Sequence, residues 1–197
     1  KRLLGALPNT KAPTRKLDDP AENPAALAII HKPGQVQSQV TLLLPGLKRT
    51  HPDYWKMSLL MNILGGNDSL MFTRLRDDLG LVYSAWFYQT YRWKAGMLVG
   101  YIGCKGDSTG QALREAVKII TALQNDVPKK ELEQKRSDAL NSFVFNVDTP
   151  AELVEVYGRY YMRKEPLDTL SRIQDAFMTA SREELEILAR KFLDPKK

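Results

Sequence analysis

The run from Ile63 to Ala85 changes from helical to strand periodicity within a few residues, and it constrains the fold more than any other stretch. The pair Gly65-Gly66 is predicted to end one helix, because glycine accepts the left-handed backbone conformation that a helix exit favours. Asp68 or Ser69 can then cap a short helix that ends at Gly80, where a strand follows. The chain must therefore combine helices and strands in close alternation.

This boundary predicts the positions of two polar side chains. Arg76 falls in the last turn of the short helix, and Tyr83 falls near the start of the strand that begins at about Leu81. Because the turn at Gly80 reverses the chain between them, both side chains could point at a single external group. The buried side of the short helix is expected to consist of Leu70, Met71, Phe72 and Leu75.

The predicted strands come in two pairs. Residues 25–32 and 36–44 read as strands joined by a turn at Pro33-Gly34, which makes a hairpin plausible. Residues 81–91 and 96–105 read as a second antiparallel pair around a turn near 92–94. One face of the strand at 36–44 collects Val36, Ser38, Val40, Leu42 and Leu44.

The remaining pattern is helical. A helix is expected from about Pro52, and everything after Asp107 is predicted to be helical, with caps at Asp107 or Ser108, at Thr149 and at Ser181. A sheet with this many helices favours an α+β two-layer sandwich, in which helices cover one face of an antiparallel sheet. The predicted helical core positions are Leu59, Leu60, Ile63, Leu64, Leu113, Ala116, Val117, Ile120, Leu123, Leu132, Ala139, Leu140, Phe143, Val147, Leu185, Leu188, Ala189 and Phe192.

Length and charge bound the domain organisation. A chain of 197 residues suits one domain, and we predict a leader or interdomain linker at residues 1–24, with its four prolines, followed by a single domain at 25–197.

Five of the six net positive charges lie in residues 1–16, which disfavours a nucleic-acid-binding face. No apolar run approaches the ~20 residues of a membrane helix. Because residue 1 is Lys, the chain is expected to be a fragment of a longer protein.

Catalytic chemistry is sparse in this sequence. His31 and His51 are 20 residues apart, and Cys104 is the only cysteine, so the three ligands of a catalytic zinc site are not in place. Both histidines read better as strand-end or helix-boundary residues than as ligands. No G-x-S-x-G elbow occurs, and the glycine-containing loop at 103–110 lacks the Gly-Lys-Ser/Thr triplet of a P-loop. The chain by itself is predicted to hold no metal and to cleave no peptide.

An ordered set of short motifs resembles the pitrilysin/insulinase family of zinc peptidases, which includes mitochondrial processing peptidase and the core proteins of the respiratory cytochrome bc complex. The resemblance runs from about Pro33 to Pro195. It rests on Gln37 and Gln39, His51-Pro52-Asp53-Tyr54, Ile63-Leu64-Gly65-Gly66, Leu75-Arg76, Gly80-Leu81-Val82-Tyr83-Ser84, Glu131-Leu132 and Leu193-Asp194-Pro195.

The resemblance implies a role for this chain within a larger enzyme. In the family one domain carries the zinc motif H-x-x-E-H, which is absent here, and the zinc-free partner domain reaches the substrate with an arginine and a tyrosine that match Arg76 and Tyr83. It therefore implies a zinc-free C-terminal half, with no cofactor of its own, a zinc-bearing homologous domain or subunit as partner, and a peptide substrate. Without the resemblance, the residues favour an Arg76 that pairs with an acid and a Tyr83 that packs in the sheet.

Two functions remain open at this point. The chain is either the substrate-binding half of a zinc metallopeptidase or a non-enzymatic assembly or scaffold homologue. Retention of both Arg76 and Tyr83 favours the first. The substrate, the cellular compartment and the covalent link to the partner half are not determined by the sequence.

Overall fold

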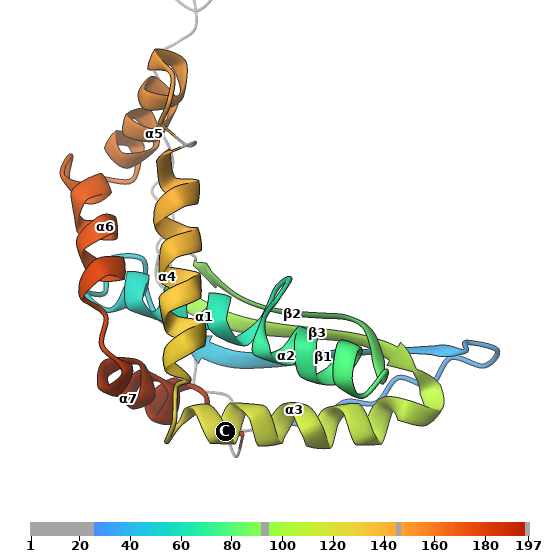
Figure 1. The fold of residues 1–197 in the computed structure, drawn as a ribbon. Coiled ribbons are helices and arrows are strands. Elements are labelled where there is room, and N and C mark those ends of the chain that lie inside the picture. The colour runs from blue at the N-terminus through green and yellow to red at the C-terminus, as the bar shows by residue number, and fades with distance from the viewer. Residues whose placement is uncertain (1–25, 92–94, 145–146, 196–197) are drawn as a thin grey trace, which may run out of the picture.

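The computed structural model describes residues 26–91, 95–144 and 147–195 (Figure 1). Three strands, β1 (Gln37–Gly46), β2 (Val82–Tyr91) and β3 (Gly96–Lys105), form one sheet. Two helices, α1 (Tyr54–Leu64) and α2 (Leu70–Phe72), lie between β1 and β2, and α2 continues as a π-helix over Thr73–Asp78. A short 3-10 turn (Gly106–Ser108) leads into the helices α3 (Thr109–Leu123), α4 (Lys129–Val144), α5 (Pro150–Met162), α6 (Thr169–Thr179) and α7 (Arg182–Phe192).

The sheet is antiparallel with the order β1-β3-β2, so β3 is its central strand. The register pairs Gln37 with Lys105 and Gly46 with Gly96 across β1 and β3. Side chains alternate between the two faces of a strand. Val40, Leu42 and Leu44 of β1 therefore share the face that packs on the main core, as the sequence predicted.

Helices α1, α2, α3 and α7 cover that same face of the sheet. The core is formed by α1, α3, α7 and the inward residues of the sheet, and α1 also packs against α4 and α6 (Figure 1). Leu59, Leu60, Ile63 and Leu64 of α1 are completely buried, which confirms the predicted stripe. The fold is the expected α+β arrangement of an antiparallel sheet with helices packed on one face.

The predicted first strand is wrong. Residues 26–36 form no strand, although the turn at Pro33-Gly34 is present and Gly34 has a φ of +78°. The Gln35 backbone N–H donates to the Lys32 carbonyl across this turn, at 3.3 Å. Leu27, Ile29 and Ile30 are more than 80% exposed, so no core lies beneath this segment. Apolar alternation without a pairing strand and a packed face does not make a sheet strand.

The helices after β3 agree with the sequence-based prediction in number and order. One of them, α3, is rotated about its axis relative to the predicted buried face. In α3 the buried positions are Ala112, Ala116, Ile120 and Leu123. Leu113 and Val117, which were predicted as core, are only half-buried because the helix presents the neighbouring row to the sheet. In α4 Leu132 is buried, and Ala139 and Leu140 are partly buried. The predicted core residue Phe143 has a side chain outside the described part of the chain.

The caps predicted at Thr149 and Ser181 are present, and both are capping boxes. Thr149 caps α5 with Pro150 at the first helical position, and Ser181 caps α7, each with a glutamate at the third position that bonds back to the cap. Ser108 occupies the N-cap position predicted for α3, but its side chain makes no capping bond. The 3-10 turn continues directly into α3 there, and Thr109 Oγ1 donates to the Gly106 carbonyl at 2.8 Å.

Gly65 ends α1 for a reason other than the one predicted. Its backbone is extended, with φ of −138°, and only Gly66 has a positive φ, of +112°. A Cβ at Gly65 would lie 2.1 Å from the Phe87 backbone nitrogen. The residue is therefore required for the close approach of α1 to β2. The predicted leader at 1–24 lies outside the described residues, and the single domain at 25–197 stays a prediction.

Candidate functional site

Arg76 lies in a π-helical segment at the end of α2. Over Thr73–Asp78 each helical hydrogen bond spans one more residue than in an α-helix. Such π-helical turns are rare in proteins and are often found at functional sites. The exit is closed by two backbone bonds: Gly80 N–H to the Arg76 carbonyl at 3.0 Å, and Leu81 N–H to the Leu75 carbonyl at 2.8 Å. Gly80 has a φ of +60°, which glycine adopts without strain. The helix end is thus tightly held beneath Arg76.

The Arg76 side chain is exposed and stacks on its own helix. Its guanidinium carbon lies 4.8 Å from the centre of the Phe72 ring. Among the residues that the structure describes, it makes no ion pair or side-chain hydrogen bond. The nearby acid Asp78 pairs instead with Arg74, at 3.1 Å. The alternative in which Arg76 pairs with an acid is therefore not what the described residues form, and the guanidinium donors face solvent.

Tyr83 sits on a β-bulge at the start of β2. Val82 pairs with Cys104 and Ser84 pairs with Gly103, so two residues of β2 span a single step of β3. Val82 and Ala85 are buried, and both residues between them, Tyr83 and Ser84, lie toward the uncovered side. Bulges change the direction of a side chain, often near active sites. Tyr83 is 48% exposed and does not pack into the core. The alternative in which Tyr83 packs in the sheet, which the residues favoured without the family resemblance, is therefore not what the structure shows.

The face of the sheet opposite the helices is uncovered in the described chain and carries aromatic side chains. The register places Thr41, Tyr101 and Trp86 in one row across the three strands. The adjacent row contains Leu43, Val99 and Tyr88. Trp86 is 43% and Tyr88 49% exposed. Sequence reasoning did not single out this face, although the alternation in β2 after the bulge carries its signal.

Metal-ligating groups do not gather in the described residues. No cluster of three or more His, Cys, Asp or Glu side chains occurs there that could hold an ion. His51 acts at the helix boundary, where its Nδ1 accepts the Asp53 backbone N–H at 3.1 Å. Cys104 is buried and unpaired. Within the described part of the chain, no helix is both long and apolar enough to cross a membrane.

Arg49 joins parts of the chain that are far apart in the sequence. Arg49 bonds both Glu165 carboxylate oxygens, at 3.2 and 3.4 Å, and its guanidinium lies over the Trp55 ring at 4.1 Å and the Tyr54 ring at 4.9 Å. Burial raises the pKa of Tyr54, partly offset by the hydrogen bond with Arg49, and burial also raises the pKa of Tyr160 nearby. Arg49 is mostly buried and holds its ion pair and ring contacts inside the protein, which marks it as structural.

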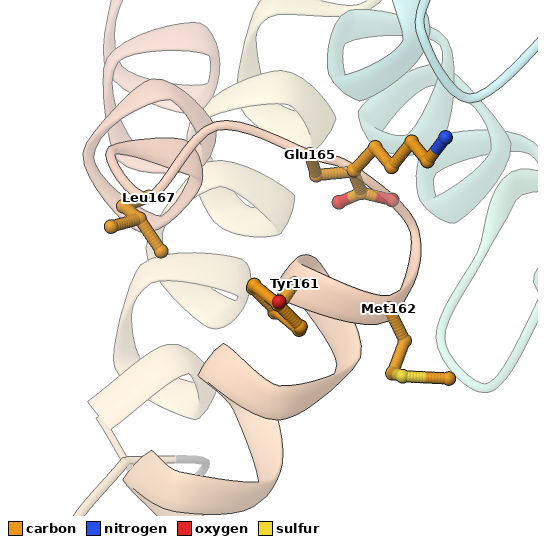
Figure 2. A pocket seen from close by; sticks show the side chains of 5 residues that line it. Tyr161, Met162, Glu165 and Leu167 are labelled. Atoms are coloured by element: carbon orange, nitrogen blue, oxygen red, sulfur yellow. The ribbon is translucent and has the colours of Figure 1, made fainter.

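Two hollows lie away from the Gly80 turn. The larger, about 510 Å³, is at the corner between α5 and α6, where Figure 2 shows Tyr161 and Met162 on one side and Glu165 and Leu167 on the other. The smaller, about 300 Å³, lies beside Gly65-Gly66 and α4, where Lys135 Nζ donates to the Asn67 carbonyl at 3.1 Å. Neither hollow includes Arg76 or Tyr83.

The sequence of this chain matches proteins described as zinc proteases. Residues 1–138 match the family described as the peptidase M16 inactive domain. The chain is 27% identical over 157 residues to the uncharacterized zinc protease YmxG of Bacillus subtilis, covering 78% of this chain and 38% of that protein. An uncharacterized zinc protease of Streptomyces coelicolor is 32% identical over 111 residues, which cover 50% of this chain and 24% of that protein. The chain thus spans well under half the length of these relatives.

Solved structures agree with this at the level of fold. A peptidase M16 inactive domain from Pseudomonas fluorescens superimposes with a TM-score of 0.81 at 22% identity, covering 92% of this chain and 43% of that one. A protease from Helicobacter pylori gives a TM-score of 0.77 at 18% identity, covering 85% of this chain and 41% of that one. Because the family match covers more than half of the sequence, the chain belongs to the peptidase M16 inactive domain family, the zinc-free C-terminal type of domain in pitrilysin-like zinc peptidases.

Proposed function

We propose that this chain is the substrate-binding half of a zinc metalloendopeptidase and supplies Arg76 and Tyr83 to the active site of a zinc-bearing partner half. The partner is a homologous domain or subunit, and it alone holds the zinc ion. Membership of a family of inactive domains and likeness to part of a longer zinc protease support this assignment. The substrate is a peptide that lies between the two halves.

One observation carries the proposal. Arg76 and Tyr83 flank the Gly80 turn, and both side chains are exposed and without hydrogen-bond partners among the described residues. Each is held by an irregular backbone element, a π-helix for Arg76 and a β-bulge for Tyr83. Exposed polar side chains on locally fixed backbone suit a group that must meet a ligand without rearrangement.

The two side chains would perform different parts of peptide binding. The Arg76 guanidinium presents several N–H donors in a fixed plane, which suits the carbonyl oxygens of a bound peptide. The Tyr83 phenol donates a single hydrogen bond, which suits the oxygen that becomes negatively charged when water attacks the peptide carbonyl. No proton transfer is required of either residue. The attacking water and its activation belong to the zinc-bearing half.

Steady-state kinetics of the complete two-half protein tests this proposal. Tyr83→Phe should lower kcat by about 100-fold or more, because a donor to the developing charge acts only in the transition state. Arg76→Ala should chiefly raise KM, because ground-state contacts to the peptide are lost. Tyr161→Phe, which removes an exposed tyrosine hydroxyl on α5, away from the Gly80 turn, serves as the control and should leave both constants unchanged.

The scaffold alternative gives a different result in the same experiment. If the complete protein hydrolyses no peptide although its other half holds zinc, the chain serves assembly. Full activity of both variants in an active protein would return Arg76 and Tyr83 to a structural role. The isolated chain is not a suitable assay, because the proposed chemistry needs both halves.

A further inference from the structure

The open face of the sheet continues directly from Tyr83 as a row of exposed aromatic side chains. After the bulge, β2 alternates regularly, so Trp86 and Tyr88 lie on the same face as Tyr83. At about 3.3 Å per residue, Trp86 lies roughly 7–10 Å and Tyr88 roughly 14–17 Å along the strand from Tyr83. These separations match alternate side chains of an extended peptide.

Neighbouring strands widen the row into an apolar platform. Tyr101 of β3 stands beside Trp86, and Val99 stands beside Tyr88. Leu43 of β1 completes the second row and is 59% exposed. Val99 is buried although it lies outside the main core, because its neighbours in the row cover it. Clusters of exposed aromatic and aliphatic side chains of this kind mark binding surfaces.

The platform is also uncharged. From the Gln39–Gly103 pair to the Pro45–Met97 pair, the outward positions of β1 and β3 hold only polar-neutral or apolar residues. The same is true of the outward positions of β2 from Ser84 to Thr90. Selection of a peptide by its basic or acidic residues would need a charge of opposite sign on this face. The chemistry therefore fits apolar and aromatic side chains.

At the end near Tyr83, the platform contains a glycine, which has no side chain. Gly103 faces outward opposite Ser84, and a Cβ at this position would lie 2.9 Å from Ser84 Oγ. Glycine at this position therefore leaves space for the Ser84 hydroxyl over the β3 backbone. The step between Tyr83 and the aromatic row carries only the small residues Ser84 and Gly103.

We propose that this face is the specificity surface of the enzyme: Trp86, Tyr88 and Tyr101 bind apolar or aromatic side chains of an extended peptide, a few residues from the bond that is cleaved. This inference rests on the proposed function, because its position is defined from Tyr83. The substrates it selects are neutral, apolar stretches of unfolded polypeptide, and not charged segments.

Matched peptides test the inference in the complete two-half protein. The probes are internally quenched ten-residue peptides of zero net charge, with two Phe residues or two Ser residues at alternate positions on one side of the cleaved bond, and both sides are assayed. The parent protein should prefer the Phe peptide over the Ser peptide on one side by roughly tenfold in kcat/KM. Trp86→Ser and Tyr88→Ser should each remove most of that preference while leaving the Ser peptide unaffected.

Two further variants separate binding from structure. Trp86→Phe keeps an aromatic surface and should retain the preference, whereas Tyr161→Ser, which removes an exposed aromatic side chain on α5, should change nothing. Equal loss for Phe and Ser peptides would mean that the face instead supports folding or packs on the zinc-bearing half, and would overturn the inference. A change in oligomeric state would point to a second copy of the chain, with the same consequence.

The outcome is distinguishable from failure of the proposed function. If Tyr83→Phe impairs both peptides but Trp86→Ser and Tyr88→Ser leave the preference intact, the platform is wrong and the Arg76/Tyr83 assignment stands. If Tyr83→Phe has no effect but the preference is lost in the Trp86 and Tyr88 variants, the platform stands and the role of Tyr83 is wrong. A parent protein with no preference between the peptides contradicts the platform outright.

Discussion

At the scale of single residues, the contacts around an arginine distinguish a structural role from a binding role. Arg49 and Arg76 both stack on aromatic rings, but Arg49 is also bonded to Glu165, with side chains that are only 15% and 6% exposed. Arg76 lacks such a partner among the described residues. The sequence offers no sign of the Arg49–Glu165 pair, because its members are 116 positions apart. The motif around Arg76 consists of residues that are neighbours in the sequence, so it could be recognised from the sequence alone.

Removing Arg49 should destabilise the fold. Arg49→Ala leaves the Glu165 carboxylate buried without its partner, and breaking a buried pair typically costs about 3–5 kcal/mol of unfolding free energy. The control is Arg172→Ala, which breaks the exposed pair with Asp168 and should cost less than ~1 kcal/mol. Urea denaturation measures both, and equal midpoints for the two variants would contradict the structural role of Arg49.

Two glycines should respond in opposite directions to alanine. Gly65→Ala places a methyl group against the Phe87 backbone and should lower stability by about 1–3 kcal/mol through overpacking. Gly158 lies inside α5 with open space around it, so Gly158→Ala should raise stability by about 0.5–1 kcal/mol. Thermal unfolding of the pair checks the close approach of α1 and β2. A neutral Gly65→Ala would show that the helix can move away.

At the scale of elements, regular periodicity was predictable and its interruptions were not. The capping boxes, the β2–β3 pair and the α1 stripe follow from local patterns of two and 3.6 residues. The bulge at Tyr83 and the π-helix around Arg76 each insert one residue into such a pattern. An insertion of this kind depends on pairing and packing elsewhere, so the sequence predicted the location of both side chains but not the backbone that directs them.

The predicted hairpin failed at the same scale. Residues 26–32 have the composition of a strand, but β1 pairs only with β3 among the described residues, and nothing packs on Leu27 or Ile29. Strand propensity expresses how well a side chain fits a half-buried surface, and here that surface is missing. Local composition alone could not show this.

The rotation of α3 gives a testable ranking. Ile120→Ala should cost about 2–5 kcal/mol, because Ile120 is 3% exposed in the core. Leu113→Ala, on the half-buried row, should cost clearly less. Chemical denaturation midpoints would order the two variants. Equal costs for the two variants would support the sequence-based face, which contained both residues, over the observed one.

The cap of α7 makes stability depend on pH. A hydrogen bond from Lys56, and then one from the Ser181 backbone, lower the pKa of Glu184 below its ordinary value of about 4.5. A carboxylate with a lowered pKa in the folded state stabilises it fully above the ordinary value, and that stabilisation is lost as the pH falls through the lowered pKa. Glu184→Gln should therefore flatten the decline in melting temperature below about pH 4.5, whereas an unchanged decline would contradict the assigned contacts.

At the scale of the whole molecule, the chain combines a helical side that forms the core with a chemically distinct open side. The helices and one face of the sheet form the core, while the other face carries Tyr83 and the aromatic row. The fold class and the family were predictable from the sequence. The open face was not, because its residues become neighbours only through the register of three strands.

The most direct test of the account is peptide hydrolysis by the complete two-half protein with Arg76→Ala and Tyr83→Phe combined, measured together with its zinc content. The account predicts that the double variant keeps its zinc and its melting temperature, because both changes are on exposed side chains and the metal is held by the other half. Turnover should fall by at least about 100-fold. Undiminished turnover by a folded, zinc-loaded double variant would contradict the claim that this domain contributes to the active site.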